Sequence, residues 1–176
     1  LQRKKEAENI CKKLGADFHF LDQEIYSISI DKTSQLFKKF FIKYNPDILF
    51  IPFLLDDNDD HRRVNQCLLN TFNNINIKPE VWAYQVYTPL PGNVAIDITS
   101  IALKKSELIK QYKTQMLKRD WAHFSLGLNA FNCRLISEAK NKNYFECFFV
   151  LPLDEYLELC RIYFSGNNTY YEKNYK

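Results

Sequence analysis

The chain has 176 residues, a net charge of +3 and an apolar fraction of 46%. These values fit one soluble domain with a buried core, and they exclude disordered, collagen-like and disulfide-scaffold proteins. The basic residues are spread along the chain rather than clustered, which argues against a nucleic-acid partner.

The amino-terminal part of the chain predicts a helix, a strand and a second helix. Residues 3–14 place apolar side chains at helical spacing, and Gly15 follows as a C-cap. Residues 16–21 alternate in polarity and predict a strand. Asp31 is expected to cap a helix that runs to about residue 43, because Asn45-Pro46 then breaks the pattern.

Residues 47–53 form the most apolar segment of the chain, with the sequence DILFIPF. A continuous apolar run of this length predicts a strand buried on both faces, as in a parallel sheet. A polar loop follows at residues 56–60, and apolar positions at helical spacing then predict a helix over residues 61–73.

The remaining elements continue the alternation of strands and helices. Strands are predicted over residues 81–88, 94–98 and 144–150. Helices are predicted over residues 101–117 (capped by Ser100), 121–140 and 154–163. We therefore expect a single α/β domain over residues 1–164, with a Rossmann-like, mostly parallel sheet flanked by helices, and a polar tail over residues 165–176.

The cysteines and the hydropathy suggest a reducing compartment. The five cysteines form no CxxC pair, so neither a zinc knuckle nor a redox motif is indicated. No apolar run reaches the length needed to span a bilayer, and residues 1–13 are too charged for a signal peptide. We expect a cytoplasmic protein without a transmembrane segment.

The loop 56–60 carries four carboxylates within five residues and is followed by His61. Acidic residues favour the positive end of a helix dipole, so a solvated helix N terminus is one interpretation. Calcium-loop spacing fails, because His61 stands where Gly is required and Cys67 where Glu is required. A transition-metal site using His61, with Asp59 or Asp60 supporting it, is the third interpretation, although zinc needs more protein ligands.

Five segments in the right order resemble the LmbE-like, or PIG-L, family of N-acetylglucosaminyl deacetylases. The matching segments are RKKEA…LG at 3–15, DILFIPF…DDNDDHRRVN at 47–65, YQVYTPLPGNVAIDIT at 84–99, the helix at 105–115 and YFECF at 144–148. The resemblance implies a Rossmann-like α/β fold and a divalent metal, usually zinc. It also implies hydrolysis of an N-acetyl group from a GlcNAc-type sugar, possibly in cell-surface glycan biosynthesis.

The resemblance assigns roles to the loop residues. His61 aligns with a metal-binding histidine, Asp60 with the aspartate that precedes it, and Asn58 with a first histidine that steadies the oxyanion. Asn58 can donate a hydrogen bond but cannot carry the positive charge of an imidazolium. Arg62 is expected to contact a sugar or anion, or else to lie on a solvated helix face.

Other matched positions lie outside the loop. Asp97 and Gln115 are expected to bind substrate or support the site, with a purely structural role left open for Asp97. Arg3 and Glu6 belong to a structural motif of the family's helix.

Two functions remain open at this stage. The chain begins with Leu1 and its single methionine is Met116, so we expect it to lack the family's amino-terminal H-P-D-D segment, which supplies further metal ligands and the general base. The chain is either a zinc-dependent de-N-acetylase that needs that segment, or a non-catalytic relative that acts as a binding module. The expected substrate is an N-acetylated amino sugar, the non-catalytic relative would be a binding or interaction module, and a homo-oligomer is possible.

Overall fold

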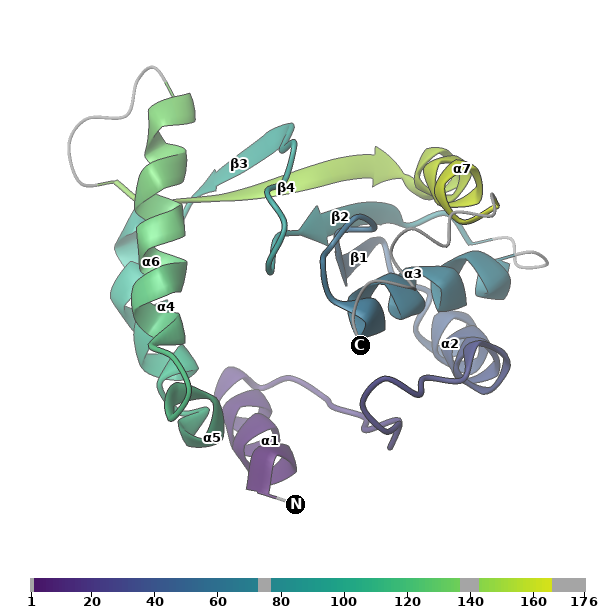
Figure 1. Cartoon of the computed structure of the whole chain (residues 1–176), viewed down its shortest axis with the longest axis horizontal. Helices are drawn as coiled ribbons and strands as arrows, with labels where there is room; N and C mark the ends of the chain where they lie inside the picture. Colours follow the sequence, from purple (N-terminus) through teal and green to yellow (C-terminus); the bar gives the residue numbers. More distant parts are fainter. Residues whose placement is uncertain (1, 73–76, 137–142, 166–176) are drawn as a thin grey trace. The chain divides into compact units, whose positions relative to one another are not determined.

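The computed structural model of the chain describes residues 2–72, 77–136 and 143–165 (Figure 1). It divides into two compact units, unit 1 with Leu1–Phe20 and Ala95–Cys147, and unit 2 with Leu21–Val94 and Phe148–Lys176. Compact units do not by themselves define domains, so the single domain over 1–164 stays a prediction. Most of the predicted tail, residues 166–176, lies outside the described residues.

Four strands form one sheet, in the order β1-β2-β4-β3. They are β1 (Ile48–Pro52), β2 (Glu80–Tyr84), β3 (Val94–Asp97) and β4 (Phe145–Pro152). β1 runs parallel to β2, with Ile48 opposite Glu80, whereas β2 runs antiparallel to β4, with Glu80 opposite Pro152. The predicted α/β class is confirmed, but the expectation of a mostly parallel sheet is wrong, because β1 and β2 form the one parallel pair among the strands that the structure describes.

Three helices of unit 2 surround its core. They are α2 (Ile30–Tyr44), α3 (Asp59–Thr71) and α7 (Leu153–Phe164). α3 packs on β1 and on α2, and α7 packs on β2 and on α3. The buried apolar side chains between them are Phe41, Ile51, Phe53, Leu54, Leu68, Val81, Ala83, Leu153, Tyr156, Leu157 and Cys160.

β1 buries one face rather than the two that its apolar sequence predicts. Ile51 faces the core and is 3% exposed, whereas Ile48 and Phe50 are 46% and 57% exposed. Successive side chains of a strand point to opposite faces, and the helices that pack on β1 cover only the face of Ile51. The Phe50 ring contacts the rings of Trp82 and Phe148 instead.

The ends of α2 are set by local hydrogen bonds. The hydroxyl of Ser29 accepts from the Lys32 backbone N–H, so Ser29 is the N-cap and Asp31, the predicted cap, lies in the first turn. Asn45 ends the helix in the left-handed region with φ 40°, and its N–H donates to Phe41. The predicted break at Asn45-Pro46 is confirmed.

Unit 1 contains the helices α1 (Gln2–Leu14), α4 (Ala102–Ile109), α5 (Lys113–Met116) and α6 (Trp121–Asn132), with short 3-10 turns η2 (Thr99–Ile101) and η3 (Cys133–Leu135). Gly15 follows α1 with φ 65°, as predicted. The predicted strand over 16–21 does not form, and the predicted helix over 101–117 is divided among η2, α4 and α5. Ser100 makes no side-chain cap.

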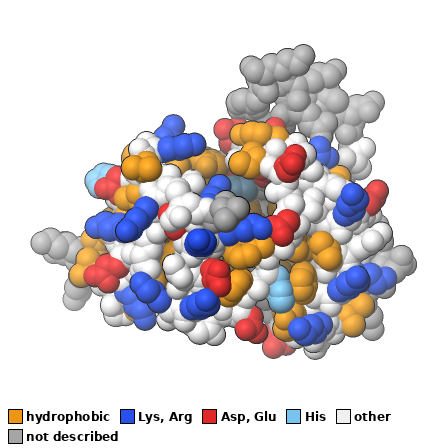
Figure 2. Space-filling model, turned by 90° about the horizontal axis from the view of Figure 1, so that it is seen from below, with side chains coloured by type: hydrophobic (Ala, Val, Ile, Leu, Met, Phe, Trp, Pro, Cys, Tyr) orange, Lys and Arg blue, Asp and Glu red, His pale blue; other side chains and the backbone are white. Residues whose placement is uncertain are grey.

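The surface carries charges of both signs. Lysine, arginine and acidic side chains are interspersed with apolar ones on the face that Figure 2 shows. Within the described ranges, no helix combines the length and the apolar character that crossing a membrane requires.

Candidate functional site

The loop that links β1 to α3 lies at the carboxyl end of β1. Because β2 runs parallel to β1, the segment after β2, which contains Tyr87, begins at the same edge of the sheet. Ligand sites in α/β proteins form at this edge. Residues 56–62 and Tyr87 all belong to unit 2.

Asp56 is the buried centre of the loop. Its side chain is 0% exposed, and its two oxygens accept hydrogen bonds from three partners. Oδ1 accepts from the Asn58 backbone N–H at 3.0 Å and meets His61 Nδ1 at 2.9 Å, while Oδ2 accepts from the Tyr87 N–H at 2.9 Å. Burial by itself would raise the pKa of Asp56, but these hydrogen bonds outweigh it and lower the pKa from 3.8 to about 2.

His61 is held in one orientation by two contacts. Its Nδ1 meets Asp56 at 2.9 Å, and its ring stacks on that of Tyr87 with centroids 5.8 Å apart and planes at 16°. The side chain is 26% exposed, so the ring is not sealed from solvent. A carboxylate on one ring nitrogen fixes the tautomer and leaves Nε2 as the nitrogen that can meet a ligand.

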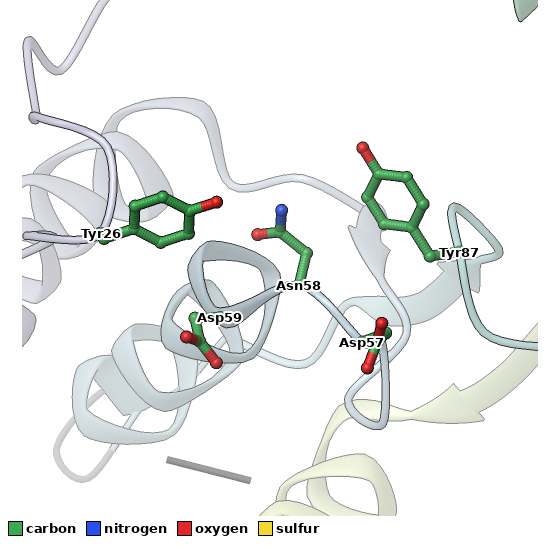
Figure 3. A pocket seen from close by; sticks show the side chains of 5 residues that line it. All are labelled: Tyr26, Asp57, Asn58, Asp59 and Tyr87. Atoms are coloured by element: carbon green, nitrogen blue, oxygen red, sulfur yellow. The ribbon is translucent and has the colours of Figure 1, made fainter. Parts of the chain in front are cut away.

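Asn58 is the N-cap of α3. Its Oδ1 accepts from the backbone N–H groups of Asp60 and His61, at 2.9 and 3.3 Å. Because the cap uses the oxygen of the amide, the NH₂ group is the part of the side chain that can donate to a ligand. Figure 3 shows the amide between the rings of Tyr26 and Tyr87.

Asp60, Arg62 and Asp59 of the loop also have hydrogen-bonding partners. Asp60 Oδ1 accepts from the Tyr26 backbone N–H at 3.0 Å. Arg62 is 6% exposed, and it donates to the Asp56 carbonyl at 2.7 Å and to the Asp59 carboxylate. The Arg62 guanidinium therefore stabilises the crowded carboxylates from inside the loop, and a solvated helix face does not describe it.

A pocket of about 580 Å³ opens beside this loop (Figure 3). It is lined by Tyr26, Asp57, Asn58, Asp59 and Tyr87. A pocket of this size that combines two aromatic rings with a few converging polar groups can hold a small ligand.

The described side chains do not complete a zinc site. A catalytic zinc needs three protein ligands, whereas among the described residues no three His, Cys, Asp or Glu side chains are grouped to hold a metal. His61, oriented by Asp56, suits one ligand position only. We therefore derive no chemical step through a metal.

Four predicted positions lie in unit 1. Asp97 is exposed, and its pKa is lowered by hydrogen bonds from the Thr99 side chain and from the Thr99 N–H at 2.8 Å. The half-buried Gln115 lies in α5, and Arg3 is exposed on α1. Glu6 accepts from the Thr114 hydroxyl at 2.6 Å, so it ties α1 to α5.

The sequence predictions missed three features of the site. The carboxylate that contacts His61 belongs to Asp56, whereas we expected Asp59 or Asp60 to support it. Tyr87 could have been found, because it follows a strand parallel to β1 and so shares the same sheet edge. No sequence pattern identified Tyr26, because a loop brings it to the pocket.

Comparison with known proteins supports the family resemblance. The family model of the PIG-L, or GlcNAc-PI de-N-acetylase, family matches residues 1–72, which include the whole loop and α3, and confirms the resemblance over this part of the chain. No curated protein matches the chain. Among solved structures, it is similar to the conserved protein TT1542 from Thermus thermophilus, with a TM-score of 0.64, 15% identity, and coverage of 84% of this chain and 72% of that one. This likeness shows a shared fold.

Proposed function

We propose that this chain is a de-N-acetylase-like protein that binds an N-acetylated amino sugar of the GlcNAc type beside the N terminus of α3. The observation that carries the proposal is the match of residues 1–72 to a family named for de-N-acetylation of a GlcNAc conjugate. The pocket lies within this part of the chain except for Tyr87.

The hydrogen-bonding groups of the pocket suit an acetamido sugar. The Asn58 NH₂ group can donate to the acetamido carbonyl, and the carboxylates of Asp57 and Asp59 can accept from sugar hydroxyls. A hydrogen bond from Asn58 to that carbonyl would also polarise it toward attack by water. His61 Nε2, next to the lining residues, is one group of this loop that could accept a proton or bind a metal, and the carboxylates of Asp57 and Asp59 are others.

The second candidate is a non-catalytic relative that binds the sugar without hydrolysing it. Two observations favour it, namely the incomplete metal-ligand set among the described residues and the use of the Asn58 oxygen as a helix cap. Binding is common to both candidates, and they differ in whether acetate is released.

The experiment measures binding and hydrolysis on the same protein. N-acetylglucosamine is titrated calorimetrically, and acetate release from it is followed with and without added Zn²⁺. Binding with acetate release that His61→Ala abolishes supports the hydrolase, whereas binding without release supports the binding module. Absence of both overturns the proposal.

A matched control separates the site from general effects. His123 is exposed on α6 in unit 1, and its replacement by Ala is expected to change neither binding nor release. Bound zinc per chain, measured by mass spectrometry of the native protein, tests the expected zinc dependence independently of turnover.

A further inference from the structure

Two tyrosines of the pocket are anchored by two carboxylates of the same loop. The backbone N–H of Tyr26 donates to Asp60 Oδ1 at 3.0 Å, and that of Tyr87 donates to Asp56 Oδ2 at 2.9 Å. The two residues are far apart in sequence, yet one five-residue segment fixes the backbone of both. Their rings lie on opposite sides of the Asn58 amide (Figure 3).

A further constraint acts on the ring of Tyr87 and on the backbone of Tyr26. The Tyr87 ring stacks on His61, which Asp56 orients in turn. Tyr26 has a positive φ of 62°, a backbone conformation that is unfavourable for a non-glycine residue. The hydrogen bond to Asp60 keeps Tyr26 in this conformation, with its side chain beside the pocket and the residue 74% exposed.

Exposed aromatic rings on two sides of a polar group suit the apolar faces of a sugar ring. A tyrosine offers an apolar face for C–H groups and a hydroxyl at its rim, and few rotatable bonds have to be ordered when it binds. The amide between the rings offers donors to a carbonyl or a hydroxyl.

The charge around the pocket restricts which sugars fit. Asp57 and Asp59 line the pocket, so two carboxylates border any ligand that enters it. The buried guanidinium of Arg62 offsets part of this charge from within the loop. An anionic group in the pocket would be repelled, and salt would weaken that repulsion.

We propose that Tyr26 and Tyr87 form an aromatic clamp that selects uncharged or cationic amino sugars and disfavours phosphorylated ones. The clamp rests on the proposed function, and it adds the residues that determine which amino sugars bind. The acetamido carbonyl is held by Asn58 between the two rings, and the carboxylates face the hydroxyl-rich rim of the sugar.

The test compares three probes and three variants by calorimetry at low salt. The probes are N-acetylglucosamine, glucosamine and N-acetylglucosamine 6-phosphate, and the variants are Tyr26→Ala, Tyr87→Ala and Ile25→Ala. Ile25 is the matched control, because it is 67% exposed beside Tyr26 and does not line the pocket. Each tyrosine variant is expected to weaken N-acetylglucosamine binding about 3- to 10-fold, and the control to leave it unchanged.

The selection against phosphorylated sugars is tested by comparing the affinities of the three probes. The 6-phosphate is expected to bind about tenfold more weakly than N-acetylglucosamine at low salt, with a smaller difference at high salt. Glucosamine lacks the carbonyl that Asn58 holds but carries a positive charge, so its affinity relative to N-acetylglucosamine is expected to be higher at low salt than at high salt. If the wild type binds N-acetylglucosamine but the tyrosine variants bind equally well, or if the phosphate binds as tightly, the clamp is refuted and the proposed function stands. If the wild type binds none of the probes, both are refuted.

Discussion

Asp56 links three parts of unit 2 through one carboxylate. The Asp56 carboxylate accepts hydrogen bonds from the start of α3 and from the segment after β2, and Arg62 donates to the backbone carbonyl of Asp56. A buried charge is tolerated only when such partners replace the water that it lost. The pocket therefore depends on a residue that does not line it.

Replacing Asp56 with Asn is expected to lower the free energy of unfolding by about 2 kcal/mol or more at neutral pH. An amide can accept on one side only, so its NH₂ group would face the N–H donor of Tyr87 or the donors at Oδ1. Urea unfolding measures the effect. Asp57→Asn is the control, because Asp57 is exposed and its replacement should cost less than about 0.5 kcal/mol.

The stabilisation by Asp56 is also expected to depend on pH. Its pKa is lower in the folded state, at about 2, than its ordinary value of 3.8, so between these values the unfolded chain binds more protons. The stabilisation of about 2 kcal/mol is therefore present above about pH 4 and is lost as the pH falls toward 2. A difference between wild type and Asp56→Asn that stayed constant from pH 7 to about 2.5 would contradict this assignment.

Asn58 combines a structural and a binding role that two substitutions can separate. Serine also caps helices well, so Asn58→Ser is expected to keep the free energy of unfolding within about 0.5 kcal/mol, whereas Asn58→Ala should cost about 1 kcal/mol. Both remove the NH₂ group and should weaken N-acetylglucosamine binding about 3- to 10-fold. Calorimetry and urea unfolding of both variants check this, and a Ser variant that binds like wild type would exclude Asn58 as the donor.

The sequence located the loop but not its internal contacts. Four carboxylates before a histidine at the end of an apolar strand were enough to identify the segment. Which carboxylate meets His61 depends on the turn between Asp56 and Asn58, where the Asn58 N–H bonds back to Asp56. No spacing rule distinguishes Asp56 from Asp60, since both lie within reach of the histidine along the chain.

At the scale of elements, Asn65 and Tyr156 connect α3, β1 and α7. The Tyr156 hydroxyl donates to Asn65 Oδ1 at 2.8 Å, and Asn65 Nδ2 donates to the carbonyls of Pro52 and His61, both at 2.9 Å. Both residues are 0% exposed. These hydrogen bonds therefore fix the position of α3, which begins at the pocket, on the sheet.

Breaking this pair is expected to destabilise the protein in a coupled way. Tyr156→Phe should cost about 1–2 kcal/mol and Asn65→Ala about 3 kcal/mol, because each leaves buried polar groups without partners. The double variant should cost less than the sum by about 1 kcal/mol or more, which a double-mutant cycle in urea measures. Tyr44→Phe, with an exposed hydroxyl that accepts from Lys43, should have little effect. Additive costs would show that the two residues act separately.

Helices and strands were predictable where a strong local signal agreed with the packing. β1 and α3 formed within two residues of their predicted limits, because an apolar run and helical spacing met a shared core. Residues 16–21 alternate in polarity but form no strand, since an alternating pattern needs a neighbouring strand to pair with. The direction of β4 against β2 could not be read from either sequence, because both directions suit an apolar strand.

At the scale of the whole molecule, the five cysteines report on burial in the two units. All five are free thiols, and all lie in the described ranges. Cys67 in α3 and Cys160 in α7 are 0% exposed within unit 2. Burial raises the pKa of Cys67 from 9.0 to about 11 and that of Cys160 to about 12. Cys11, Cys133 and Cys147 of unit 1 are partly exposed.

Alkylation of the native protein with iodoacetamide should therefore distinguish two classes of thiol. The thiolate is the reactive form, so at pH 8 the raised pKa values alone lower the reactive fraction of Cys67 and Cys160 about a hundredfold or more, and burial slows access further. Peptide mass spectrometry should find adducts at Cys11 and Cys133 first, then at Cys147, whose pKa burial also raises. In urea all five should react, and the urea concentration at which Cys67 and Cys160 become reactive measures the unfolding of unit 2. Equal rates for Cys160 and Cys11 without urea would contradict the core packing on which α3 and the pocket depend.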